Sequence, residues 1–185
     1  MVATFSRAVI VARFLDGEPL KFTRFWSEGL PDPRAYFNQW HPSKFEYRGF
    51  PFENAEQAMM AEKAALFADF GTLARIFNTP SPRAVKALGR EVSGYVDGAW
   101  ADVRLARVVE ISVAKYSQNA NMLQALLATG DSVLVEASPE DRIWGIGMSE
   151  RDHRCHNPTL WEGENLLGEA LMITRQLLAP MTHEE

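Results

Sequence analysis

A short stretch of the C-terminal half combines carboxylates, a tryptophan and two glycines. Directly after the apolar run Val133–Val135 the chain continues EASPEDRIWGIG. The apolar run is typical of a buried strand, and the two glycines allow the backbone to bend or to approach another group closely. This change of character indicates either a strand end with a polar turn or a site in which Asp141 and Trp144 face a ligand.

Polar residues also recur at helical spacing in segments that we predict to be helices. Side chains three, four or seven residues apart lie on the same face of a helix. Charged helical residues mostly face solvent, so each set is either part of a solvated surface or directed into one cleft. The sets are Glu56 with Lys63, Lys86 with Arg90, and Lys115 with Gln118 and Asn119.

Three other kinds of site are disfavoured by the sequence. His153, Cys155 and His156 lie close together, but zinc needs three or four ligands at defined spacing and no second cysteine exists. Cys155 has no orienting third group that would make it a nucleophile. Gly145 and Gly147 lack the strand-to-helix context of a dinucleotide-binding loop. We therefore expect no metal and no cofactor.

Composition limits the class of protein. The 185 residues are 46% hydrophobic and 23% charged, which is typical of a folded globular chain. The formal net charge is -5 and the basic residues are scattered, so extended nucleic-acid binding is not expected. A lone Cys155 argues against internal disulfides and favours a cytoplasmic location. No signal peptide is recognised, and no apolar run approaches the about 20 residues that span a bilayer.

The positions of turns and caps predict the elements that must hold these side chains. Residues 8–15 and 21–26 are expected to form a hairpin with a turn at residues 16–19, and 44–52 a second hairpin. Residues 28–43 are expected to be a loop, and 133–135 a strand. Helices are predicted over 55–70, where Asn54 and Gln57 have the spacing of a capping box, and over 82–89, where Ser81 precedes Pro82. Further helices are predicted from apolar spacing over 99–115, 121–128 and 165–179. The sequence therefore predicts one α+β domain over residues 1–185, mostly helical with a small sheet.

Several of these segments together resemble one family. The stretches ENAEQAMMAEKAALFAD, SPRAVKALGREV, KYSQN, LLATGDSVLVEASPEDRIWGIG and LWEGENLLGEALMITRQLL are similar, in order and spacing, to the motifs of the NADAR or YbiA-like family. The resemblance covers residues 22–178 and implies a YbiA-like fold. Known members include N-glycosidases that act on early intermediates of riboflavin biosynthesis and enzymes that remove ADP-ribose from guanine. They are not known to require a metal.

The resemblance also implies which residues form the site. Positions matching Asp141, Trp144, Glu56 and Trp100 belong to the family's active site. Cleavage of an N-glycosidic bond passes through an oxocarbenium-like transition state, which a carboxylate such as Asp141 can stabilise. A poorly solvated carboxyl group such as Glu56, flanked by methionines, could protonate the leaving nitrogen or position water. The assignment of acid and base between the two stays open.

The remaining matched positions would bind the substrate. Trp100 and Trp144 would stack on the base or line the pocket. The cationic side chains of Lys63, Arg90 and Lys115 would hold a 5'-phosphate, and the amides of Gln118 and Asn119 would bind sugar or base. Family members commonly have Ser-Asn where this chain has Asn38 and Gln39, just after an expected insertion over residues 29–35. We expect this loop to border the base.

Three functions follow as hypotheses. The first is hydrolysis of a ribosylaminopyrimidine 5'-phosphate, with release of ribose 5-phosphate. The second is removal of ADP-ribose from guanine bases. The third is a binding module without catalysis that recognises a nucleotide or ADP-ribose derivative; the presence of both Glu56 and Asp141 argues against it. The expected partner is thus a phosphorylated N-riboside or an ADP-ribosylated base.

Overall fold

The computed structural model describes residues 5–26 and 32–179. The chain is α+β with helices in the majority, as the sequence predicts. It divides into two compact units, here called the split unit (Met1–Phe37 with Leu123–Glu185) and the continuous unit (Asn38–Met122). Helix α6, Ala120–Leu127, contains the second boundary between them. That all 185 residues form one domain stays a prediction.

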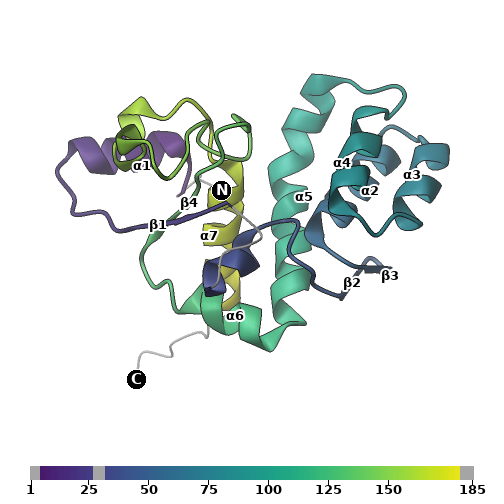
Figure 1. The fold of residues 1–185 in the computed structure, drawn as a ribbon, viewed down its shortest axis with the longest axis horizontal. Helices are drawn as coiled ribbons and strands as arrows, with labels where there is room; N and C mark the ends of the chain where they lie inside the picture. Colours follow the sequence, from purple (N-terminus) through teal and green to yellow (C-terminus); the bar gives the residue numbers. More distant parts are fainter. Residues whose placement is uncertain (1–4, 27–31, 180–185) are drawn as a thin grey trace. The chain divides into compact units, whose positions relative to one another are not determined.

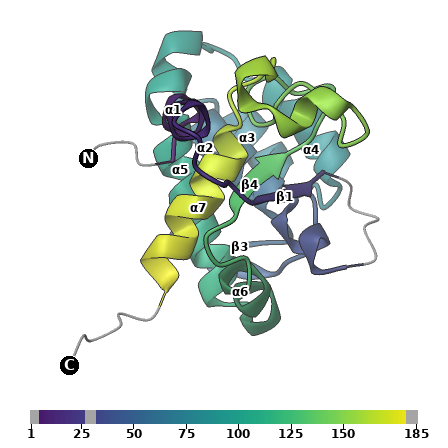
Figure 2. The same cartoon turned by 90° about the vertical axis from the view of Figure 1, so that its left-hand side faces the viewer.

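The split unit is built around a two-stranded parallel sheet. Strand β1 pairs with β4 from Phe22 opposite Val133 to Phe25 opposite Glu136. Helix α7 packs against β4, as Figure 2 shows, and Gly168 permits this contact because a Cβ there would lie 2.1 Å from the Leu134 carbonyl oxygen. The elements are α1 (Arg7–Leu15), β1 (Phe22–Phe25), η1 (Pro33–Phe37), β4 (Val133–Glu136), η2 (His153–His156), η3 (Pro158–Leu160) and α7 (Leu166–Leu178).

The first predicted hairpin is wrong. Residues 8–15 belong to helix α1, and β1 finds its partner in β4 rather than in the preceding segment. The Ser6 hydroxyl caps the helix by accepting a hydrogen bond from the Val9 amide, a start signal that the β-branched run at 9–11 obscured. The predicted turn after it is present, with Gly17 at a φ of 79°.

The continuous unit is a helical cluster with one β-hairpin. Figure 1 shows α2, α3 and α4 grouped beside the long α5, and α2 contacts all three of the others. The predicted hairpin at 44–52 is confirmed, with Phe45 opposite Phe52. The elements are β2 (Phe45–Tyr47), β3 (Phe50–Phe52), α2 (Ala55–Leu66), α3 (Phe70–Phe77), α4 (Pro82–Arg90) and α5 (Asp97–Ser117).

Helix starts in this unit follow their capping residues. Asn54 accepts a hydrogen bond from the Gln57 amide, and Ser81 precedes a proline in the first turn of α4, as predicted. The first helix is shorter than predicted, because Ala68 takes a φ of 53° and ends it. Asp69 then caps a separate helix, α3, through the Thr72 amide.

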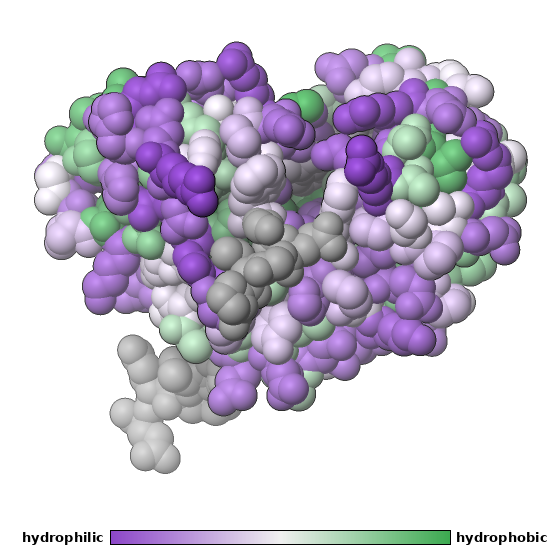
Figure 3. All heavy atoms as spheres, in the orientation of Figure 1, coloured by the Kyte–Doolittle hydropathy of each residue, from purple (hydrophilic) through white to green (hydrophobic). Residues whose placement is uncertain are grey.

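The described residues contain two separate two-stranded sheets, β1 with β4 and β2 with β3, rather than one small sheet. Residues 27–31, which overlap the start of the predicted loop (28–43) and of the expected insertion (29–35), lie outside the described residues. The following part of that loop contains the 3-10 helix η1. Figure 3 shows mostly hydrophilic residues on the face that it draws, with apolar residues in small patches. Every helix in the described ranges is too short or too polar to span a bilayer.

Candidate active site

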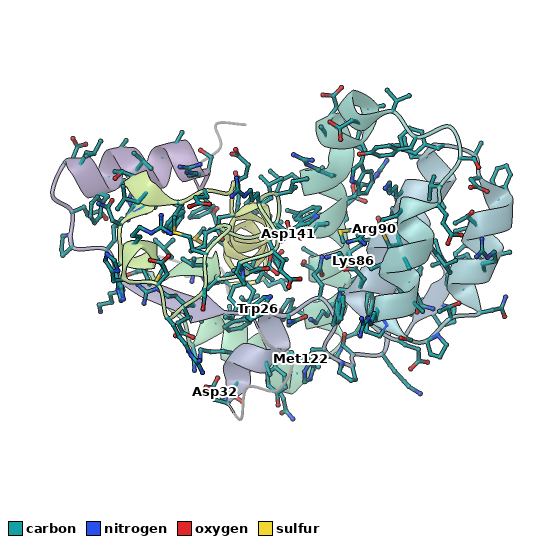
Figure 4. The ribbon with its side chains drawn as sticks, turned by 45° about the horizontal axis from the view of Figure 1, so that its top comes forward. Trp26, Asp32, Lys86, Arg90, Met122 and Asp141 are labelled. Atoms are coloured by element: carbon teal, nitrogen blue, oxygen red, sulfur yellow. The ribbon has the colours of Figure 1, made fainter. Side chains whose placement is uncertain are left out.

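The loop after β4 holds the Asp141 carboxylate in a defined orientation. Its Oδ1 atom accepts hydrogen bonds from the Ile143 amide at 3.0 Å and the Trp144 amide at 2.8 Å, and the Asp141 carbonyl oxygen accepts one from the Gly147 amide at 3.1 Å. Asp141 (Figure 4) and Trp144 are half-buried. Two backbone donors on one oxygen fix the side chain relative to the backbone that carries Trp144.

The glycines of this loop are required by close packing of backbone against backbone. A Cβ on Gly145 would lie 2.9 Å from the Glu136 carbonyl oxygen, and one on Gly163 would lie 2.2 Å from the Gly145 carbonyl oxygen. Gly147 has a φ of 69°, which favours glycine. The polar, glycine-containing segment after Val135 is therefore more than a surface turn, because its backbone packs closely against the segment that leads into α7.

Glu56 lies in the first turn of α2 and is only 3% exposed. Its backbone amide donates a hydrogen bond to the Gln39 carbonyl oxygen at 3.1 Å. The Gln57 side chain extends the cap by accepting from the Glu53 amide at 2.9 Å. The continuous unit thus holds this carboxyl group at a capped helix start, in the poorly solvated position that the sequence suggested.

Lys115, near the end of α5, is 2% exposed. Its Nζ donates a hydrogen bond to the Asn38 carbonyl oxygen at 3.1 Å. Burial lowers the pKa of the Lys115 ammonium group to about 7, because removal from water disfavours the charged form. Burial and the nearby Lys115 charge also lower the pKa of His41. Consecutive carbonyls of Asn38 and Gln39 therefore contact Lys115 and the backbone of Glu56.

The lowered pKa of Lys115 predicts a pH-dependent stability. Between about pH 7 and 10.5 the unfolded chain binds a proton at Lys115 that the folded chain does not. The free energy of unfolding should therefore rise with pH in this window, by up to about 1.4 kcal/mol per pH unit. Subtracting the curve of Lys115→Met, measured by urea unfolding between pH 7 and 10, should isolate this slope.

The matched control for this measurement is Lys44→Met, since the Lys44 side chain is 84% exposed. Subtraction of the Lys44→Met curve should leave no slope above the experimental error. Identical pH profiles for wild type and Lys115→Met would contradict a perturbed Lys115.

The amides predicted to bind sugar or base are engaged with the backbone of the continuous unit. Gln118 accepts from the Glu46 amide and donates to the Glu46 carbonyl oxygen, both at 2.8 Å. Asn119 donates to the carbonyl oxygens of Lys44 at 3.2 Å and Lys115 at 2.7 Å. These bonds attach the end of α5 to strand β2 and its approach, so ligand binding by the two amides would require them to exchange partners.

Replacement of Gln118 by methionine should therefore lower stability more than it weakens substrate binding. The variant removes both bonds to Glu46 at similar side-chain length, and we expect a loss of about 1–2 kcal/mol. Urea unfolding and KM of the same preparation measure the two effects, with exposed Gln124→Met as the control. A raised KM at unchanged stability would instead identify Gln118 as a substrate ligand.

The other predicted residues occupy several parts of the continuous unit. The Lys63 Nζ donates to the Gly89 carbonyl oxygen at 2.7 Å and lies 4.1 Å from the centre of the Tyr95 ring; burial lowers the pKa of this lysine. Arg90 follows Gly89 and is exposed on the last turn of α4 (Figure 4). Trp100 is buried in the first turns of α5.

Sequence reasoning missed two features of the site. Asn38 and Gln39 act through backbone carbonyls, which carry no side-chain signature. Asn165, which precedes α7, bonds β4 with its side chain; its place beside two glycines in the quoted motif was the available signal. Among the described residues, no group of three or more His, Cys, Asp or Glu could hold a metal ion.

Comparisons with known proteins agree on one family. The NADAR domain model matches residues 24–179. N-glycosidase R617 of Acanthamoeba polyphaga mimivirus is 39% identical over 145 residues, 76% of this chain and 85% of that protein. The riboflavin biosynthesis protein VVA0006 of Vibrio vulnificus is 27% identical, over 78% of this chain and 35% of that protein. The solved structure of Escherichia coli YbiA is 25% identical, with a TM-score of 0.72 and coverage of 89% of both chains.

Proposed function

Because the chain belongs to the NADAR domain family, we propose that it hydrolyses the N-glycosidic bond of a ribosylaminopyrimidine 5'-phosphate and releases ribose 5-phosphate. The reaction class follows from similar proteins: R617 and YbiA are N-glycosidases, hydrolases of glycosyl bonds. The substrate is the proposed part. The similarity to VVA0006, a riboflavin biosynthesis protein, supports it.

The observation that carries the proposal is that Glu56 and Lys115 are both buried and both bonded to the backbone at Asn38 and Gln39. The carbonyl oxygens of Asn38 and Gln39 bind the Lys115 ammonium group and the Glu56 amide. A buried ammonium group gains most from an anion that compensates its desolvation, and the substrate's phosphate is such an anion. A buried carboxyl group is suited to donating a proton to a leaving nitrogen.

In this proposal each predicted residue has a role. Asp141 stabilises positive charge at the anomeric carbon or activates water, and Glu56 protonates the leaving nitrogen or positions the water. Trp100 and Trp144 contact the base. The phosphate is held by Lys115 with Lys63 and Arg90. Gln118 and Asn119 would bind sugar or base by exchanging their backbone partners. No cofactor or metal takes part, and the lone Cys155 supports a reducing cytoplasmic location.

A parallel release assay tests the function. Purified protein is incubated with the pyrimidine riboside 5'-phosphate and, separately, with ADP-ribosylated guanosine, and free ribose 5-phosphate and free ADP-ribose are quantified. The proposal expects release from the first substrate. Release from the second alone would identify a de-ADP-ribosylating enzyme, and binding without release from either would identify a binding module.

A further inference from the structure

Asn165 connects β4 to the start of α7. It is 1% exposed and has a left-handed backbone with a φ of 58°. Its side-chain Oδ1 accepts from the Glu136 amide at 3.0 Å, and its Nδ2 donates to the Leu134 carbonyl oxygen at 2.9 Å. The side chain therefore bonds β4 through both a donor and an acceptor, as a neighbouring strand would.

The backbone on either side of Asn165 binds the loop that carries Asp141. Carbonyl oxygens from Arg142 to Ile146 each accept a hydrogen bond from this segment, at 2.9–3.1 Å. The Asn165 side chain makes no capping bond to α7; instead, the amides of Leu166 and Leu167 donate to the carbonyl oxygens of Ile143 and Trp144. The loop is thus the N-terminal cap of α7. The five donors are the amides of Glu162, Glu164, Asn165, Leu166 and Leu167.

We infer that Asn165 is a positioning residue for the glycosidase reaction: by bonding β4 and the loop together, it fixes the Asp141 carboxylate and the Trp144 ring. The inference rests on the proposed function and adds to it a residue that acts through another. The chain of contacts is short. Asn165 holds the loop backbone at Gly145 and β4 at Glu136, and the amides of that loop hold the Asp141 oxygen.

Asparagine is suited to this position for two reasons. It tolerates a left-handed backbone better than most residues other than glycine, and its amide supplies one donor and one acceptor. Aspartate has the same shape and also tolerates this backbone, but it would place a carboxylate oxygen against the Leu134 carbonyl oxygen. Asn165→Asp therefore removes one donor with little change in size.

The first test is kinetic. We expect Asn165→Asp to lower kcat about 10- to 100-fold, since small displacements of a catalytic group cost this much, with KM within about threefold. In an Asp141→Asn background the same change should cost no further kcat, because the carboxylate that it positions is already gone. A further loss in the double variant equal to that in the single variant would overturn the inference.

The control is Asn157→Asp in the same unit. Asn157 accepts hydrogen bonds from the amide and hydroxyl of Thr159, and aspartate can still accept both, so kcat should be unchanged. An equal loss in this control would overturn the inference as well.

The second test needs neither activity nor a variant that folds. In wild-type protein the amides of Ile143 and Trp144 should show hydrogen exchange protection similar to that of Leu166 and Leu167, because they belong to one bonded unit. Loop amides that exchange a hundredfold faster than those of α7 would overturn the inference. Absence of ribose 5-phosphate release with matched exchange would refute the proposed function alone.

Discussion

Asp141→Asn should lower kcat for release of ribose 5-phosphate by about a hundredfold or more while KM changes only a few-fold, the pattern of a lost transition-state interaction. The variant tests the carboxylate charge because it preserves the backbone bonds that orient the side chain. An asparagine Oδ1 can still accept from the Ile143 and Trp144 amides, so both backbone bonds that orient the side chain are kept while the negative charge is removed. Initial rates over a range of substrate concentrations measure both constants.

Glu140→Gln is the matched control for Asp141→Asn, because it removes a charge from the neighbouring, exposed residue. It should leave kcat within about twofold. Asp141→Ala, which also removes the Oδ1 acceptor of both amide hydrogen bonds, should in addition lower stability by about 1–3 kcal/mol. Full activity of Asp141→Asn would refute a catalytic carboxylate here and favour the binding-module hypothesis.

Gly163→Ala should strongly destabilise the fold. The added Cβ would lie 2.2 Å from the Gly145 carbonyl oxygen and 2.9 Å from the backbone of Arg142. Backbone atoms held by hydrogen bonds on both sides cannot move aside as a flexible side chain can, so we expect a loss of about 3 kcal/mol or more. Urea unfolding with tryptophan fluorescence measures it.

Gly98→Ala is the contrasting variant. Nothing lies within 4 Å of a Cβ at Gly98, which is in the first turn of α5, so alanine should be neutral or stabilise by up to about 1 kcal/mol. A Gly163→Ala protein with wild-type stability would show that the loop and the α7 entry segment are not packed as described.

The fold was predictable where local signals agree with long-range packing. Asn54 and Ser81 mark helix starts by side-chain capping, and both predictions are confirmed. Residues 9–11 are β-branched and apolar, so their local pattern fits a strand as well as a helix. The features that make this segment a helix are the Ser6 cap and the pairing of β1 with β4, which lies far along the chain. Pairing partners distant in sequence leave no trace in local periodicity.

The candidate site was predictable as a set of residue types, less so as a set of contacts. The motif resemblance selects Glu56, Asp141 and Lys115, and Glu56 and Lys115 are buried as a catalytic or binding role would favour. The backbone carbonyls of Asn38 and Gln39 that contact this pair cannot be inferred from side-chain chemistry. The roles of these residues in catalysis stay predictions.

The pairing of β1 with β4 has a consequence for synthesis on the ribosome. Thr23 and Ser132, whose hydroxyls are 2.8 Å apart, are separated by 109 positions, and the whole continuous unit lies between them. The continuous unit has all its residues by Met122, whereas β1 must await β4 and α7. Because long-range pairing is slow, we expect β1 to be among the last elements of the nascent chain to become protected, although it emerges before every other strand.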